Sequence, residues 1–273
     1  MVKLNLRQSM MVLVMLFSAD LVLANTNEEF PARKLFPAVP YIELDDLYKQ
    51  LKKVVVVDVR SEYEYETLRI KGALNIPLSS QSFTAEMEKL RAANPKSQIV
   101  MYCNGKTCKK SYQAVQKCRN HNIDNVVAYD AGIMDWAKKY PQESVLLGVS
   151  PIDPSRIIPK SVLQQREIDV EQFEAMLTNK DVIVLDVRER FQREGLSLFP
   201  GIDKQAYLDD KPALNKYINL AKKDNKTLLI YDAAGKQVQW LMYYLEDQGL
   251  KNYAFMKGGA TAYFAALRKQ YVK

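Results

Sequence analysis

An internal repeat constrains the fold more than any other feature of this chain. The segment VVVVDVRSEYEYE (Val54–Glu66) returns as VIVLDVRERFQRE (Val182–Glu194). Each copy begins with an apolar run rich in β-branched side chains, which is typical of a parallel strand that is buried on both faces. Two copies are too few for a solenoid, so the repeat indicates a duplicated domain.

The same order of elements surrounds both copies of the repeat. A helical pattern precedes each copy, a second strand and an amphipathic helix follow, and a short third strand ends close to a glycine. Alternating strands and helices at this spacing predict an α/β fold with mainly parallel sheets flanked by helices. In chain order, the predicted elements are Leu44–Lys53, Gln98–Cys103, Lys110–His121 and Asn125–Gly132 in the first copy, and Val170–Lys180, Thr227–Asp232, Gln237–Gln248 and Asn252–Gly259 in the second.

Aspartates stand where the first helix of each copy should begin. Asp45 or Asp46 is the predicted N-cap of the first, and Asp169 is the predicted N-cap of the second. An aspartate side chain at this position accepts a hydrogen bond from a backbone N–H group that the helix leaves unpaired.

The domain boundaries follow from composition. A linker is predicted over residues 148–161, because Pro151, Pro154 and Pro159 disfavour both a helix and a central strand there. One domain then spans residues 25–147 and the other spans residues 162–273. Both fit the usual size of a domain.

The first 24 residues have the pattern of an export signal. Lys3 and Arg7 precede the apolar stretch Met10–Ala24, and Val22 and Ala24 are small enough for a cleavage site. We therefore expect a signal peptide over residues 1–24, a periplasmic mature protein and no membrane association after cleavage. An uncleaved membrane anchor remains the alternative, although Asp20 interrupts the stretch.

The charge and the single histidine exclude several classes of function. The 39 basic and 32 acidic residues give a net charge of +7, but the lysines are scattered and do not form a run interleaved with aromatics. This distribution predicts a solvated surface that can attract small anions, and no nucleic-acid partner. His121 is the only histidine, which excludes a clustered-histidine metal site, and we expect neither a metal nor another cofactor.

The cysteines gather at one point of the first domain. Cys103 ends the second predicted strand, and ligand sites of open α/β sheets lie at the carboxyl ends of strands. The loop that follows is expected to aim backbone N–H groups and a helix N-terminus at the sulfur, which would stabilise a thiolate and bind an anion. The candidate loop residues are Asn104, Gly105, Lys106, Thr107, Cys108 and Lys109.

Several motifs together resemble those of a known family. DVRSEYEYETLRIKGALNIPL, followed by YCNG and then DAGIMDW, is similar to a rhodanese domain, and the resemblance extends over nearly all of the chain as two tandem copies. It implies that the Cys103 thiolate takes the outer sulfur of thiosulfate or a similar small anionic donor as a persulfide. A thiol or cyanide then accepts that sulfur. A periplasmic protein is a further candidate partner.

Two residues at the end of the repeated strand match the strand-end pair of the family. For Asp58 and Arg60 two interpretations stay open: a structural pair that fixes the geometry of the loop, or a contact with the substrate.

The second copy departs from the family pattern at the position of the nucleophile. Asp232 stands where Cys103 stands in the first copy, and no cysteine follows Cys118 in the chain. A carboxylate cannot carry a persulfide and repels an anionic donor. We therefore predict that the second domain is inactive as a transferase.

Cys108 has three interpretations that the sequence leaves open. It is a packing residue of the loop, the partner of Cys103 in a disulfide, or the thiol that resolves a Cys103 persulfide. If the first two cysteines form a disulfide, the chain is alternatively a non-enzymatic module that responds to sulfur or redox state. Cys118, three and four residues after Val115 and Ala114 on a predicted helix, is expected to face the core.

Overall fold

The computed structural model describes residues 29–193 and 197–271. The predicted signal peptide, residues 1–24, lies outside this described part. The chain divides into two compact units, and the division falls at residues 145–153. Each unit is built around its own five-stranded sheet.

The first unit holds a parallel sheet with the strand order β1-β6-β5-β2-β4. Its strands β2 and β5 lie side by side in register, so that Val55 pairs with Ile99 and Asp58 pairs with Tyr102. The bounds of the strands are β1 (Tyr41–Ile42), β2 (Val55–Asp58), β4 (Leu74–Asn75), β5 (Ile99–Tyr102) and β6 (Val126–Tyr129).

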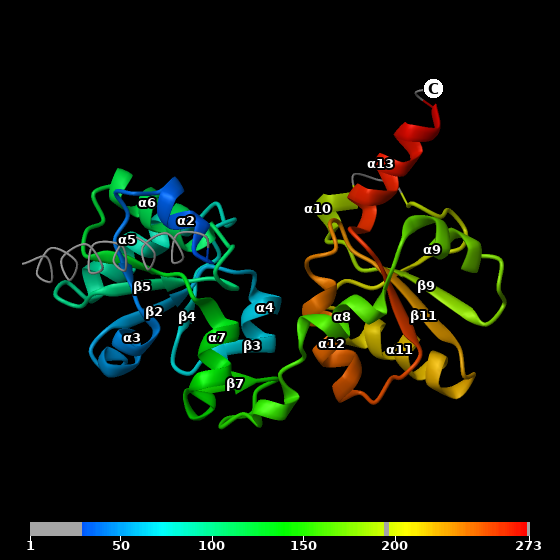
Figure 1. The fold of residues 1–273 in the computed structure, drawn as a ribbon, viewed down its shortest axis with the longest axis horizontal. Coiled ribbons are helices and arrows are strands. Elements are labelled where there is room, and N and C mark those ends of the chain that lie inside the picture. Colours follow the sequence, from blue (N-terminus) through cyan, green and yellow to red (C-terminus); the bar gives the residue numbers. More distant parts are fainter. Residues whose placement is uncertain (1–28, 194–196, 272–273) are drawn as a thin grey trace, which may run out of the picture. The chain divides into compact units, whose positions relative to one another are not determined.

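Helices cover both faces of this sheet. Figure 1 shows α5 and α6 on one face and α3 on the other. A separate two-stranded sheet pairs β3 with β7. The remaining elements are α2 (Pro31–Leu35), α3 (Leu44–Gln50), α4 (Glu62–Thr67), β3 (Leu68–Ile70), α5 (Phe83–Ala93), α6 (Lys110–Asn120), α7 (Gly132–Lys139), the 3-10 turn Pro141–Glu143 and β7 (Ser144–Leu146).

The core of the first unit lies between the sheet and α5 and α6. Val57, Met101 and Ala128 face it from three adjacent strands, and Phe83 and Val115 face it from the two helices. All five are essentially inaccessible to solvent, so this burial anchors the frame from which the loop after β5 extends.

The second unit repeats the arrangement of the first. Its parallel sheet has the strand order β8-β12-β11-β9-β10, which is the order of the first sheet element for element. The bounds are the 3-10 turn Pro154–Arg156, α8 (Lys160–Arg166), β8 (Glu167–Ile168), α9 (Val170–Met176), β9 (Val182–Asp186), α10 (Arg190–Arg193), β10 (Lys204–Gln205), α11 (Lys211–Lys223), β11 (Thr227–Tyr231), α12 (Val238–Asp247), β12 (Tyr253–Met256) and α13 (Gly259–Tyr271). The predicted fold class is therefore confirmed.

The helix starts test the predicted caps, one of which is right and one wrong. Asp169 caps α9 and forms a reciprocal capping box with Gln172. The N-cap of α3 is Glu43, and its side chain makes no capping bond. Asp45 and Asp46 lie inside the first turn, where their carboxylates bond to side chains instead of to backbone N–H groups.

Two further findings concern the ends of the predicted segments. Helix α8 begins at Lys160, so the last two residues of the predicted linker are helical. Within the described residues, the helices are all too short or too polar to cross a lipid bilayer.

Candidate functional site

Cys103 follows the last residue of β5, at the carboxyl edge of the first sheet. Its side chain is almost fully buried, with 2% of the residue exposed. The carbonyl of Cys103 accepts a hydrogen bond from the backbone N–H of Ile133 at 3.0 Å, which fixes the strand end against α7. Helix α6 begins at Lys110, as the sequence predicts, so residues 104–109 form the loop between strand and helix.

The loop contains a disulfide. Cys103 and Cys108 are bridged, with their Cα atoms 6.3 Å apart. Cys108 is only partly buried and packs against the edge of the core. Its backbone N–H donates to the carbonyl of Gly105 at 2.8 Å, which closes a turn inside the loop. Of the three interpretations of Cys108, the structure contains the disulfide.

A glycine lets this loop approach the end of β6. Gly132 has a φ of +75°, and a Cβ atom there would lie 2.6 Å from the carbonyl carbon of Asn104 and closer still to Gly105. A side chain at this position would therefore displace the loop. The contact gives the glycine of the DAGIMDW motif a direct structural reason.

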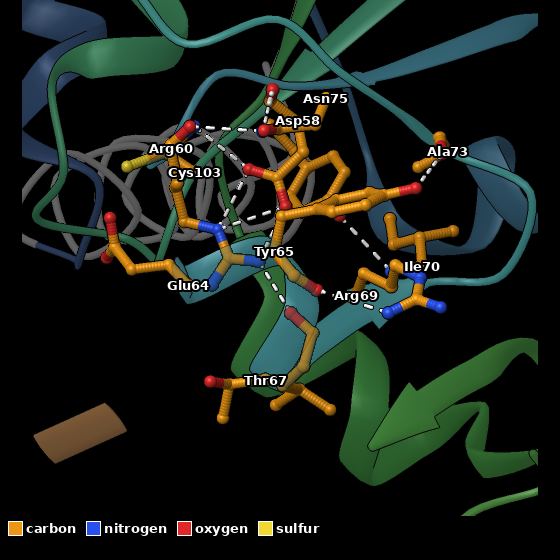
Figure 2. A network of polar contacts seen from close by, with 12 residues as sticks. Asp58, Arg60, Glu64, Tyr65, Thr67, Arg69, Ile70, Ala73, Asn75 and Cys103 are labelled. Atoms are coloured by element: carbon orange, nitrogen blue, oxygen red, sulfur yellow. Dashed lines mark hydrogen bonds and ion pairs between the residues drawn. The ribbon is translucent and has the colours of Figure 1, made fainter. Parts of the chain in front are cut away.

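Asp58 and Arg60 form a buried ion pair beneath the loop, and both side chains are inaccessible to solvent. The Arg60 Nε lies 2.9 and 3.1 Å from the two carboxylate oxygens of Asp58, and Nη2 lies 2.5 Å from Oδ2 and 2.6 Å from the carbonyl oxygen of Leu68. Figure 2 shows this network. Although burial favours the neutral form of the guanidinium, the charge and hydrogen bonds of Asp58 raise the pKa of Arg60.

The ion pair acts on the loop through Asn104. Arg60 Nη1 donates to Asn104 Oδ1 at 3.2 Å, and Asn104 Nδ2 donates to Glu64 Oε1 at 2.9 Å. Glu64 is itself held by Ser61 in the capping box that begins α4. Asn104, the residue after Cys103, is thus held by hydrogen bonds to both Arg60 and Glu64. These contacts support the structural interpretation of Asp58 and Arg60.

The charge of Arg60 also acts on Glu64. Burial raises the pKa of this carboxyl, but the guanidinium of Arg60, the ammonium of Lys110 and the hydrogen bonds from Asn104 and Ser61 outweigh it. The net effect is a pKa below the usual value for glutamate, so Glu64 is ionised at neutral pH.

Sequence reasoning missed two residues of this network. Glu64 could have been found, because Ser61 and Glu64 have the spacing of a capping box just after a strand. Asn75 could not have been found in this way. It lies on β4, and its Nδ2 donates to the carbonyls of Asp58 and Arg60, both at 3.1 Å, at the end of the neighbouring strand β2. No short sequence pattern predicts a hydrogen bond between a side chain and the backbone of a distant segment.

The remaining loop residues are more exposed. Lys106, expected to add positive charge near the sulfur, is paired with Glu29 and with Asp135, the latter at 3.2 Å. The hydrogen bond that Lys106 donates to Glu29 is the main reason why the pKa of Lys106 is raised. Thr107 and Lys109 are exposed.

The third cysteine lies apart from this loop. Cys118 is unbridged and is buried in α6, which confirms the expectation that it faces the core. Burial raises the pKa of its thiol to about 12, so Cys118 is a neutral, unreactive thiol at physiological pH.

The corresponding site of the second unit holds Asp232 directly after β11. Its carboxylate, only 1% exposed, accepts hydrogen bonds from the backbone N–H groups of Ala234 (3.0 Å), Gly235, Gln237 (2.6 Å) and Val238 (3.3 Å). Below it, Arg188 Nη2 lies 2.8 Å from Asp186 Oδ2 in a second buried ion pair. The loop of the second unit therefore surrounds an anion supplied by its own chain.

No group of three or more His, Cys, Asp or Glu side chains is arranged to hold a metal ion in residues 29–193 and 197–271. A hollow of about 300 Å³ lies at the opposite end of the first sheet from Cys103, and its lining contains no cysteine, serine or histidine. Its lining is Leu51, Val54, Val55, Val56, Lys71, Gly72, Leu74 and Asn94.

Comparison with known proteins finds similarities to part of the first unit. Residues 43–139 match the family model of the rhodanese-like domain. An HTH-type transcriptional regulator of Mycobacterium tuberculosis is 31% identical over 88 residues, 32% of this chain and 36% of that protein. A tRNA uridine(34) hydroxylase of Pectobacterium carotovorum is 34% identical over 88 residues, 31% of this chain and 24% of that protein. The chain thus matches about a quarter to a third of the length of these relatives.

Solved structures give similar matches. A thiosulfate sulfurtransferase from Pseudomonas aeruginosa is 19% identical with a TM-score of 0.35, and the match covers 86% of this chain and 47% of that one. A human single-domain sulfurtransferase is 29% identical with a TM-score of 0.31, and the match covers 37% of this chain and 97% of that one. The match to the model of the rhodanese-like domain thus covers the part of the chain that contains β2, β5, β6 and the loop after β5.

Proposed function

We propose that this protein is a sulfurtransferase that carries sulfane sulfur as a persulfide on Cys103. The observation that carries the proposal is the position of Cys103, at the carboxyl end of β5 in a rhodanese-like domain and in a loop braced by Arg60 and Asn104. A thiolate at this position attacks the outer sulfur of thiosulfate, the bond between the two sulfurs of the donor breaks, and sulfite leaves. An acceptor thiol or cyanide then removes the sulfur.

The disulfide sets a condition on this chemistry. While Cys103 is bridged to Cys108, it has no free thiol that could ionise to a thiolate. It therefore cannot accept sulfane sulfur. The competent form of the enzyme is therefore the dithiol. Activity should depend on prior reduction.

The donor and its partners are proposed from charge and chemistry. A small sulfur-containing anion suits the net charge of +7 and the N-terminus of α6, which begins seven residues after Cys103. No metal or organic cofactor takes part in the proposed transfer.

The direct test is the formation of thiocyanate from thiosulfate and cyanide by the reduced protein. Cys103→Ser should abolish the activity, and Cys118→Ser is the matched control because Cys118 is buried away from the loop. If neither the reduced wild type nor reduced Cys108→Ser forms thiocyanate, and Cys108→Ser takes up no sulfur from thiosulfate or another sulfane donor, the proposal is wrong.

A second candidate function is favoured by the disulfide itself. A non-enzymatic module that senses redox state would cycle between the bridged and the reduced loop without transferring sulfur. Such a module would show a reversible disulfide and form no thiocyanate, and its reduced Cys108→Ser variant would gain no persulfide from any sulfane donor. The same assay therefore separates the two functions.

The proposed location is the periplasm, which follows from the signal-like residues 1–24. Fractionation of the native host followed by N-terminal sequencing tests it. A mature chain that begins at Asn25 in the periplasmic fraction supports export and cleavage. A full-length chain in the cytoplasmic fraction contradicts it.

A further inference from the structure

The loop after β5 places a second sulfur within bonding reach of the proposed sulfur carrier. Cys103 and Cys108 form a disulfide within this loop, and their Cα atoms are 6.3 Å apart. The turn from Gly105 to Cys108 and the start of α6 at Lys110 hold the second cysteine there. Once the bridge is reduced, the thiol of Cys108 can return to the sulfur of Cys103 without a rearrangement of the sheet.

The two cysteines differ in access to solvent. Cys103 is 2% exposed, whereas Cys108 is only partly buried at the edge of the core. An outer reagent therefore meets Cys108 first, while Cys108 itself is placed to attack Cys103 from within the loop.

We propose that Cys108 resolves the Cys103 persulfide, so that the site releases hydrosulfide and is reset by an external dithiol. This inference rests on the proposed sulfur transfer and names its acceptor. The Cys108 thiolate attacks Sγ of Cys103, and a bond forms between the two Sγ atoms. The bond from Cys103 Sγ to the outer sulfur breaks, and that sulfur leaves as HS⁻ with the electron pair and its proton.

The electron balance requires a reductant. The sulfane sulfur is reduced to hydrosulfide, and the two cysteines are oxidised to the disulfide that the structure contains. Two electrons and two protons from an external dithiol restore the two thiols. The bridged loop is then an intermediate of the cycle as well as a resting form.

The difference in exposure indicates which sulfur the reductant attacks. A thiolate of the dithiol reaches the more exposed Cys108, and Cys103 leaves as a thiolate at the end of β5. This order regenerates the nucleophile in one step. The second thiol of the reductant then displaces Cys108 from the mixed disulfide, which a monothiol cannot do within one molecule.

A single-turnover experiment tests the resolution step. The full chain is reduced, freed of reductant without air and mixed with thiosulfate, and hydrosulfide is trapped with a bimane reagent at the quench. We expect the wild type to release one equivalent each of sulfite and hydrosulfide, and its mass to fall by two hydrogen atoms. Cys108→Ser should release sulfite but no hydrosulfide, and should gain the mass of one sulfur atom.

Controls make the outcomes distinct. Cys118→Ser should behave as the wild type, and Cys103→Ser should gain no sulfur. Cys108→Ala provides a second variant in case the serine disturbs the loop, and circular dichroism reports whether each variant is folded. If the wild type keeps the sulfur and releases no hydrosulfide, the resolution step is wrong and the sulfur transfer stands. If neither wild type nor Cys108→Ser takes up sulfur, both proposals fail.

A multiple-turnover arm tests the reset. With thiosulfate in excess, dithiothreitol should support hydrosulfide release at least about tenfold faster than glutathione at equal thiol concentration, because its second thiol acts within the mixed disulfide. Equal rates with the two reductants would contradict the dithiol requirement.

Discussion

The loops after β5 and β11 share a frame and differ in the residue that they surround. Both follow the central strand of a five-stranded parallel sheet, and a buried Asp–Arg pair supports each. In both, the carbonyl of the first loop residue accepts a backbone hydrogen bond from the helix that follows the next strand: from Ile133 of α7 to Cys103 at 3.0 Å, and from Ala260 of α13 to Asp232 at 2.8 Å.

The difference lies in how the central side chain is satisfied. The carboxylate of Asp232 takes backbone N–H groups from Ala234, Gly235, Gln237 and Val238, while the sulfur of Cys103 is bridged to a second cysteine of its loop. The frame is thus compatible with two outcomes. With aspartate it becomes a closed anion nest that contains its own ligand, and with cysteine it holds the sulfur that we propose as the sulfur carrier.

Replacing the central residue of each loop should have the largest effect, which is on the rate of thiocyanate formation. Cys103→Ser should lower thiocyanate formation by at least about a thousandfold, because serine forms no persulfide. Asp232→Ala should leave the activity of the reduced protein within about twofold, since the second loop carries no sulfur. Steady-state assays of both variants, with folding checked by circular dichroism, measure this. Loss of activity in a folded Asp232→Ala protein would show that the second unit takes part.

The next largest effects are expected from removing the arginine of each buried Asp–Arg pair, which should lower the free energy of unfolding. Removing the guanidinium in Arg60→Met leaves the carboxylate of Asp58 buried without its partner, which costs about 3–5 kcal/mol of unfolding free energy. Arg188→Met should cost less in the second unit, because Arg193 Nε also lies 3.4 Å from Asp186 Oδ2 and remains as a partner of that carboxylate. Urea denaturation measures both losses. Only the first should also lower kcat for sulfur transfer, because Arg60 holds Asn104 beside Cys103. Equal kinetic effects would contradict the positioning role.

Glycine replacements separate close approach from backbone strain. Gly132→Ala should cost about 2–3 kcal/mol and most of the activity, because its Cβ would meet the loop and φ is positive. The matched control is Gly72→Ala, which has φ of +78° but no neighbouring atom within 4 Å. It should cost only about 1 kcal/mol and spare the activity. Thermal unfolding and the thiocyanate assay distinguish them; equal losses would mean that strain alone matters.

Emptying the anion nest should expose a weak site. Asp232→Gly removes the internal carboxylate but keeps the N–H groups of residues 234–238. We expect millimolar thiosulfate or sulfate, about 1–10 mM, to shift the amide resonances of these residues. The wild type should show no such shifts. Unchanged spectra of the folded variant would indicate that the loop collapses without its carboxylate.

The smallest predicted effect is a pH dependence from Glu64. Its pKa is lowered in the folded state, so its contribution to stability is fully present above the usual value of 4.5 and is lost as the pH falls through the lower folded pKa. Glu64→Gln should therefore lose about 1 kcal/mol at neutral pH and little at pH near 3. Urea denaturation at both pH values measures this; an equal loss at both would contradict the assignment.

The sequence predicted those features that short patterns determine. The repeated apolar runs located β2 and β9, and the residues before Lys110 located the start of α6. The capping box at Asp169 was accessible for the same reason, since its partner Gln172 lies three residues away. By contrast, Asp45 and Asp46 look like caps but lie one and two residues inside α3.

The parts that could not be predicted depend on contacts between distant segments. Arg60 follows β2 and bonds to Asn104, which follows the neighbouring strand β5. A glycine is required at position 132 because Asn104 and Gly105 lie against it. The sequence also presented Asp232 as a lost nucleophile. Only the folded loop reveals it as the acceptor of several backbone N–H groups.

The central claim is that sulfane sulfur is carried on Cys103 and nowhere else in the chain. The most direct measurement is peptide mapping by mass spectrometry of reduced Cys108→Ser protein after exposure to thiosulfate and alkylation. The account predicts one additional sulfur atom, on the peptide that contains Cys103, and an unmodified Cys118 peptide. Absence of the added sulfur from the Cys103 peptide, or its presence on Cys118, would contradict the account.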